Sequence, residues 1–132
     1  MASDLHFIVV DDDPTNNIIC KFAIIRAFPT AEVELFTEPR KALDHIQQTE
    51  MVDEKPKTLF LDINMPLITG WDFLEIFKDF VAKIIDRYKI YILSSSIDER
   101  DRERANSNPL VAGFVSKPLT TTIIKTLNLG EA

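Results

Sequence analysis

The chain of 132 residues suits one compact domain, and its apolar fraction of 45% predicts a substantial hydrophobic core. A formal net charge of −6 argues against general binding to nucleic acids or anionic membranes. The single cysteine, Cys20, excludes an internal disulfide and a cysteine-rich metal site, and it favours a reducing, cytoplasmic location. No apolar run approaches the about 20 residues that a membrane-spanning helix needs.

The first predicted strand, Leu5–Val10, runs directly into the three carboxylates of Asp11, Asp12 and Asp13. Asp13-Pro14 predicts the start of a helix, because aspartate is a favoured N-cap and proline a favoured first helical residue. Helix capping therefore accounts for the aspartate at position 13, but it does not account for the carboxylates of Asp11 and Asp12. The helix continues through apolar residues and ends before a proline: Ile18, Ile19, Phe22, Ile25, Phe28 and then Pro29.

The middle of the chain repeats this alternation of strand and helix. A strand over Val33–Phe36 precedes a helix from about Glu38 to Glu50, and a second strand covers Thr58–Ile63. Gly70 opens a further helix. The apolar residues of these two helices follow helical spacing: Ala42, Leu43 and Ile46 in the first, and Phe73, Phe77, Phe80 and Ile84 in the second.

The last part of the chain predicts strands over Ile90–Leu93 and Val111–Val115. Between them, Asp98–Arg104 begins a helix with almost no apolar face, and Thr120–Asn128 forms a short, threonine-rich final helix. Strands that alternate with helices indicate βαβ units and therefore a parallel sheet.

Polar residues gather where these strands end, and parallel sheets bind their ligands outside the carboxyl ends of the strands. We expect Asp11, Asp12, Asp62, Ser94 and Lys117 to converge at one edge of the sheet. Carboxylate oxygens suit Mg²⁺, which would offset the repulsion between the aspartates. A carboxylate beside this cation can attack phosphorus and form an aspartyl phosphate, with the Ser94 hydroxyl donating to a phosphoryl oxygen.

Four segments in this order and spacing, VVDDDPTN, LDINMPLITG, ILSSS and FVSKPL, resemble the receiver domain of two-component response regulators. The resemblance covers essentially the whole chain and points to stand-alone receivers of the chemotaxis type. It implies an α/β fold with a doubly wound, five-stranded parallel sheet of order 2-1-3-4-5, flavodoxin-like and three-layered.

The resemblance also implies roles for individual residues. Asp62 matches the phosphoacceptor, and Asp11 and Asp12 match the acidic pair, with Asp12 the direct Mg²⁺ ligand and Asp11 acting mostly through water. Asn64 matches the position whose main-chain carbonyl binds the metal. The remaining matches are Lys117 as the family's lysine, Lys117-Pro118 as its cis peptide bond, Ser94 as the switch hydroxyl and Phe114 as the aromatic switch.

Two alternatives to a phosphorylated receiver stay open. Asp11, Asp13 and Thr15 fit the D-x-D-x-T pattern of haloacid-dehalogenase-type phosphatases, whose nucleophile would be Asp11. That class needs an acidic pair beyond the lysine, where this chain has only Glu131. The other alternative is a receiver that binds partners without phosphorylation.

The predicted function is phosphorelay signalling by a single receiver domain over residues 1–132, without an output domain and not classed as an enzyme. The implied phosphodonor is a histidine kinase or a histidine phosphotransfer protein, which receivers usually meet on the first helix, here around Ile18 and Ile25. A downstream effector protein would dock on the face formed by the fourth helix, the fifth strand and the fifth helix. We expect a monomer or weak homodimer that binds neither nucleic acid nor membrane.

Overall fold

The computed structural model describes residues 5–49, 56–80, 88–95 and 98–127. Strands and helices alternate strictly along the chain. In order they are β1 (His6–Val10), α1 (Pro14–Ala27), β2 (Glu32–Phe36), α2 (Pro39–Thr49), β3 (Lys57–Asp62), α3 (Gly70–Phe80), β4 (Tyr88–Ser94), α4 (Glu99–Ser107), β5 (Val111–Ser116) and α5 (Thr121–Thr126).

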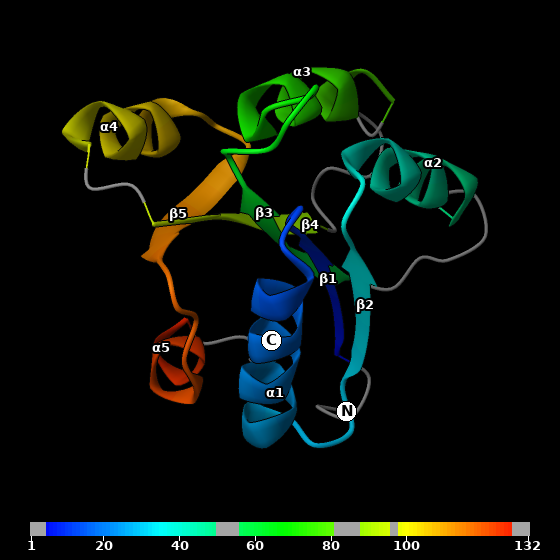
Figure 1. Ribbon diagram of the computed structural model, residues 1–132, viewed down its shortest axis with the longest axis vertical. Coiled ribbons are helices and arrows are strands. Elements are labelled where there is room, and N and C mark those ends of the chain that lie inside the picture. Colours follow the sequence, from blue (N-terminus) through cyan, green and yellow to red (C-terminus); the bar gives the residue numbers. More distant parts are fainter. Residues whose placement is uncertain (1–4, 50–55, 81–87, 96–97, 128–132) are drawn as a thin grey trace.

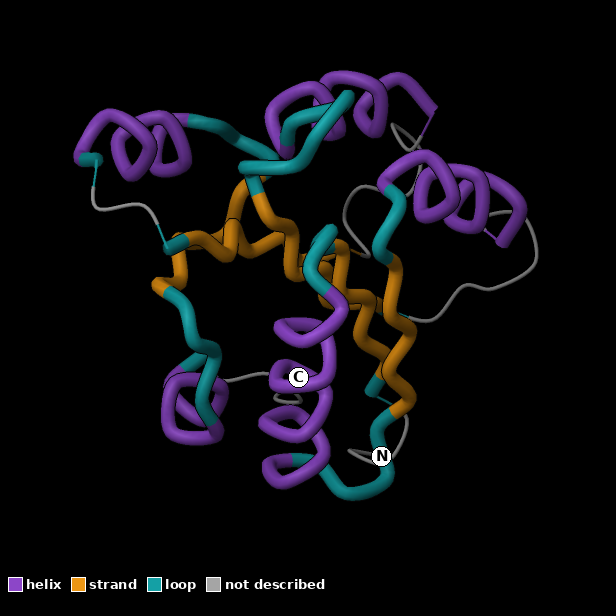
Figure 2. Tube along the Cα trace, viewed as in Figure 1, coloured by secondary structure: helices purple, strands orange, loops and turns teal. Residues whose placement is uncertain are grey.

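The five strands form one parallel sheet in the order β2-β1-β3-β4-β5. Helices α1 and α5 cover one face of the sheet, and α2, α3 and α4 cover the other (Figure 1). Figure 2 shows the same three layers, with the strands between the two groups of helices. The predicted doubly wound α/β fold and its strand order are confirmed.

Each face of the sheet packs its own hydrophobic cluster. Strands β1 and β3 are buried along their whole length, as central strands of a parallel sheet require. Under α2, α3 and α4 the largest fully buried side chains include Ile8, Leu59, Phe73 and Phe77. Under α1 and α5 they include Phe7, Phe60, Ile24 and Ile124.

Helix α1 turns several of its large apolar residues toward solvent. Ile18, Ile19 and Phe22 are 50%, 42% and 66% exposed. The face that meets the sheet follows helical spacing through residues that are mostly small or polar, with one large apolar residue, Ile24: the others are Asn16, Asn17, Cys20 and Ala23. The apolar run predicted this helix correctly, but it did not tell which side would be buried.

Element boundaries differ from the expectation by one or two residues. Strand β4 begins at Tyr88 rather than Ile90, because Tyr88 and Lys89 pair with Lys57 and Thr58 of β3. Phe73 and Phe77 of α3 are buried as predicted, whereas the side chain of Phe80 and the whole of Ile84 lie outside the described residues. In the ranges that the structure describes, no helix combines the length and apolar character that crossing a membrane requires.

Candidate functional site

Three aspartates meet at the carboxyl end of the sheet. Strand β1 ends immediately before Asp11, Asp62 is the last residue of β3, and the pairing of Val10 with Leu61 aligns the two strand ends. One carboxylate oxygen from each of Asp11, Asp12 and Asp62 lies within 4.8 Å of the others. Asp11 and Asp62 are buried and Asp12 is exposed, so the cluster opens to solvent on one side.

Lys117 brings a positive charge to this cluster from the end of β5. Its Nζ lies 2.8 Å from Asp11 Oδ2 and 3.5 Å from Asp62 Oδ1. Its backbone N–H donates to the Ser94 carbonyl at 2.9 Å, and the Lys117-Pro118 peptide bond is cis. Burial opposes the charged form, but the hydrogen bond to Asp11 and the charges of Asp62 and Asp11 outweigh it and raise the pKa of Lys117.

Asp11 is held by donors on both of its carboxylate oxygens. Oδ1 accepts from the Asp13 backbone N–H at 2.9 Å, and Oδ2 accepts from Asn16 Nδ2 at 2.6 Å in addition to Lys117. Asn17 Nδ2 donates to the Asp11 carbonyl at 3.0 Å and to the Phe36 carbonyl at 3.2 Å, which ties the ends of β1 and β2 together. With these lone pairs occupied, Asp11 is poorly suited to attack phosphorus.

The two asparagines are site residues that the sequence analysis missed. Both are buried in the first turns of α1, Asn16 at 8% exposure and Asn17 at 2%. The sequence offered only their position as a signal, two amides just after an acidic cluster, because the helical spacing did not show that they would be buried and so need partners. Their partners here are Asp11 and the neighbouring strand end.

The fold disfavours the charged form of Asp62. The pKa of Asp62 is raised from 3.8 to about 6: burial is the largest cause, Asp11 and Asp12 add to it, and the Asn64 N–H and Lys117 act in the opposite direction. The Asn64 N–H donates to Asp62 Oδ1 at 3.2 Å, and Lys117 faces the same oxygen. Among the residues that the structure describes, none donates to Oδ2, which leaves this oxygen available to a metal or to phosphorus.

The raised pKa of Asp62 predicts a pH-dependent stability of the metal-free protein. The folded state favours the protonated carboxyl, so the contribution of Asp62 to stability is greatest at low pH and is lost as the pH rises from about 4 through about 6. We expect Asp62 to cost on the order of 2 kcal/mol at pH 7 relative to pH 4. Urea denaturation in a metal chelator should show Asp62→Asn losing this part of the pH dependence. An identical pH profile in wild type and variant would contradict the assignment.

The residues at this cluster fit Mg²⁺. The cation prefers oxygen ligands, and the described cluster offers carboxylate oxygens from three residues with no nitrogen or sulfur ligand among them. The cluster holds three carboxylates, and in the described part of the chain one ammonium group, that of Lys117, contacts it through Asp11 and Asp62, so negative charge remains to be neutralised. Asn64, whose main-chain carbonyl is expected to bind the metal, lies two residues after Asp62, in the loop that follows β3.

Gly70 packs directly behind Asp62. A Cβ at this position would lie 2.6 Å from the Asp62 carbonyl oxygen and 2.7 Å from Ile63 Cα, and the Gly70 N–H donates to the Ile63 carbonyl at 3.1 Å. Thr69 and Asp72 then cap α3 reciprocally, each backbone N–H donating to the other's side chain at 3.1 Å. The loop after β3 is thereby held against the strand end that carries Asp62.

The two predicted switch positions lie on neighbouring strands. Ser94 is fully buried at the end of β4, and Phe114 lies on β5 opposite Ile92 of β4. Phe114 is half-buried and packs against the core on the side of α2, α3 and α4. The guanidinium carbon of Arg102 lies 4.9 Å from the centre of its ring.

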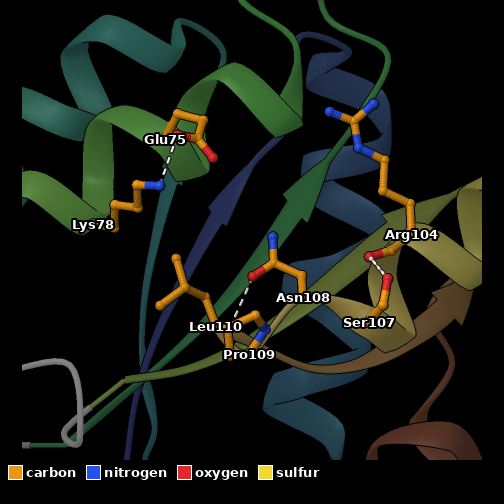
Figure 3. Close-up of a pocket in the computed structure, with 7 residues that line it drawn as sticks. All are labelled: Glu75, Lys78, Arg104, Ser107, Asn108, Pro109 and Leu110. Carbon is orange, nitrogen blue, oxygen red and sulfur yellow. Dashed lines mark hydrogen bonds and ion pairs between the residues drawn. The ribbon is translucent and has the colours of Figure 1, made fainter.

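A groove of about 360 Å³ between α3 and the end of α4 lies apart from the acidic cluster (Figure 3). Its walls carry the Glu75–Lys78 ion pair of 2.8 Å and the residues that close α4. None of the aspartates of the cluster lines it. The lining residues are Glu75, Lys78, Arg104, Ser107, Asn108, Pro109 and Leu110.

Known proteins are similar to this chain in sequence and in fold. The family model described as response regulator receiver domain matches residues 7–127. No curated protein matches the sequence.

Solved structures give the same picture. A two-component response regulator from Cytophaga hutchinsonii is 28% identical, with a TM-score of 0.85 over 92% of both chains. A response regulator receiver protein from Dyadobacter fermentans is 24% identical, with a TM-score of 0.83 over 93% of this chain and 94% of the other. The Vibrio cholerae chemotaxis protein CheY4 is 22% identical, with a TM-score of 0.74 over 94% of this chain and 96% of the other. For the Dyadobacter fermentans and Vibrio cholerae proteins, which are 24% and 22% identical, the similarity is one of fold alone.

Proposed function

The chain belongs to the response regulator receiver domain family, and from this premise we propose that it accepts a phosphoryl group on Asp62 with the help of Mg²⁺. The observation that carries the proposal is the convergence of Asp11, Asp12 and Asp62 with Lys117 at the carboxyl end of the sheet. The family also makes the haloacid-dehalogenase alternative untenable as a description of the chain, and the donors around Asp11 argue against it as nucleophile.

In the proposed reaction a carboxylate oxygen of Asp62 bonds to phosphorus, and the leaving group departs with the electron pair of its own bond to phosphorus. Mg²⁺, held by Asp12 and Asp62 with Asp11 acting mostly through water, would supply charge neutralisation at the phosphoryl oxygens. Lys117 offers a fixed ammonium group to a phosphoryl oxygen, and the Ser94 hydroxyl donates to another. The protein would thereby catalyse only its own phosphorylation and dephosphorylation.

The phosphodonor is proposed to be a histidine kinase or a histidine phosphotransfer protein. The exposed apolar residues of α1, namely Ile18, Ile19 and Phe22, support docking of such a donor, because they form an apolar surface beside the end of β1 that leads to Asp11. After phosphorylation, Ser94 would move toward the phosphoryl group and Phe114 would turn inward. A cytoplasmic effector protein would then bind to the face formed by α4, β5 and α5 and so receive the signal.

Labelling with acetyl phosphate, followed by mass spectrometry, tests the function. Phosphate on Asp62 is the expected result. Phosphate on Asp11 would instead indicate phosphatase-type chemistry, and the absence of any label under conditions in which Mg²⁺ binds would favour a receiver that works without phosphorylation.

The metal requirement gives a second test. Asp12→Ala should weaken Mg²⁺ binding at least about tenfold, because it removes a proposed direct carboxylate ligand. Titration of Mg²⁺ against the fluorescence of Trp71 measures the affinity, since α3 starts next to the site. Asp13→Asn is the matched control: the Asp13 side chain accepts from the Thr15 N–H as a helix cap, and asparagine caps equally well. Equal Mg²⁺ affinity in wild type and Asp12→Ala would refute the ligand assignment.

A further inference from the structure

Helix α4 is attached to the protein through very little buried surface. Among its residues, all of which the structure describes, only Ala105 is fully buried. Beside the end of the helix, the groove of about 360 Å³ leaves α4 and α3 without close packing there (Figure 3). A helix with so few buried apolar contacts needs other interactions to hold its position.

Two arginines supply such interactions on either side of Ala105. At about 100° per residue, Arg102 and Arg104 project from opposite flanks of the line through Ala105. The guanidinium carbon of Arg102 lies 4.9 Å from the ring centre of Phe114 on β5, and that of Arg104 lies 4.5 Å from the ring centre of Trp71 on α3. In Figure 3 the side chain of Arg104 extends away from Ser107 and Asn108. Cation–π contacts therefore fasten α4 to both of its neighbours.

We infer that the contact between Arg102 and Phe114 is a latch that opposes the phosphorylated conformation. This inference rests on the proposed function, in which Phe114 turns inward as Ser94 moves. Turning inward toward Ser94 would carry the Phe114 ring away from the Arg102 guanidinium that now lies 4.9 Å from its centre, so the proposed activation would break the contact. A ligand or modification that favours the inward conformation of Phe114 must therefore supply the free energy that is lost when the Arg102–Phe114 cation–π contact breaks.

The second contact has a different part in the transition. Trp71 lies in the first turn of α3 and takes no part in the proposed motion of Phe114, so we expect the Arg104–Trp71 contact to persist when Phe114 turns. Helix α4 is then released on its β5 side and stays attached on its α3 side. The expected motion is a pivot of α4 about Arg104, rather than detachment of the whole helix.

Beryllofluoride, a mimic of the phosphoryl group, measures the latch directly when its affinity is determined by calorimetry with Mg²⁺ in excess. Arg102→Met keeps most of the apolar stem but removes the charge, and it should tighten beryllofluoride binding about two- to fivefold. Arg102→Lys retains a cation and should bind like wild type. Arg100→Met is the control on the same helix, because Arg100 is exposed and pairs with Asp98 at 2.9 Å instead of lying over a ring.

A double-mutant cycle with Phe114→Leu separates the latch from other effects of the substitution. In the Phe114→Leu background, Arg102→Met should no longer change beryllofluoride affinity, because the aromatic partner is absent. Unchanged affinity in Arg102→Met alone, or the same tightening in both backgrounds, would overturn the inference.

Urea unfolding of the four proteins of this cycle, without metal or mimic, distinguishes failure of the latch from failure of the proposed function. The four are wild type, the two single variants Arg102→Met and Phe114→Leu, and the double variant. A coupling of about two- to fivefold in the unfolding equilibrium constant between Arg102 and Phe114 is expected. Its absence would overturn the latch even if wild type binds the mimic. If the coupling is present but wild type does not bind beryllofluoride, the proposed function fails and the regulatory part of the inference fails with it.

Discussion

Replacing Asp62 with asparagine is expected to abolish stable phosphorylation by acetyl phosphate. The amide is similar in shape, but it lacks the carboxylate oxygen that would bond to phosphorus. The fold should persist and the metal-free variant should be more stable than wild type at pH 7, because burial and the neighbouring aspartates disfavour the charge of Asp62. Acid-labile phosphate and urea denaturation measure the two effects on the same samples.

The neighbouring acidic run provides the control for this experiment. Asp13→Asn removes one carboxylate from the same segment but keeps a helix cap, so it should be phosphorylated at close to the wild-type rate. Undiminished acid-labile phosphate on Asp62→Asn would mean that another residue is the acceptor. Mapping the phosphorylated peptide in that variant would then identify it.

Gly70→Ala is expected to destabilise the protein by about 3 kcal/mol, at the upper end of the cost of overpacking. The added Cβ would approach the Asp62 carbonyl oxygen to 2.6 Å and Ile63 Cα to 2.7 Å, and backbone atoms cannot move aside as a flexible side chain can. Because the displaced carbonyl belongs to Asp62 itself, the rate of phosphorylation by acetyl phosphate should fall as well. The midpoint of urea denaturation and the initial rate of labelling measure the two consequences.

Gly113, the other glycine in the described part of the chain, tests whether the effect is specific to the close approach between residue 70 and the backbone of Asp62 and Ile63. A Cβ at Gly113 would meet the ring of Tyr91 at 3.3 Å, a contact that a small rotation of the ring relieves. Gly113→Ala should therefore cost less than about 1 kcal/mol and leave phosphorylation unchanged. Equal losses of stability in the two variants would show that the contact behind Asp62 has no special importance.

The alternation of apolar strands with helical segments was enough to predict a parallel sheet built from βαβ units, whereas the strand order was implied by the resemblance to receiver domains. The strands over Leu5–Val10 and Thr58–Ile63 correspond to β1 and β3, the two strands that the sheet buries completely, where an unbroken apolar run is the expected signal. Prediction was weaker on α1, because the helix has apolar residues on more than one side and spacing alone does not tell which side meets the sheet. Ile18 and Phe22 are accordingly exposed while Asn16 and Asn17 are buried.

The acidic cluster could be predicted because a topological rule places the carboxyl ends of parallel strands together. The contacts that support it could not, because they depend on side-chain positions that no local pattern specifies. Nothing in the sequence tells that Asn16 reaches Asp11, or that Gly70 has no room for a Cβ behind Asp62. The cation–π contacts of α4 could not be predicted either, because from the sequence alone its arginines indicate an ordinary solvated helix face.

The strand order described above also bears on how fast the protein folds. Asp11 and Asp62 come together only when β1 has paired with β3, and the segment between those strands contains all of β2 and α2. Pairings between residues so distant in the chain are slow to form, because the entropy of closing the loop is lost before the contacts compensate for it. The repulsion between the carboxylates of Asp11 and Asp62 arises at this same step, the pairing of β1 with β3. The acids at the end of the sheet therefore oppose its central strand pairing during folding, as well as weakening the finished structure.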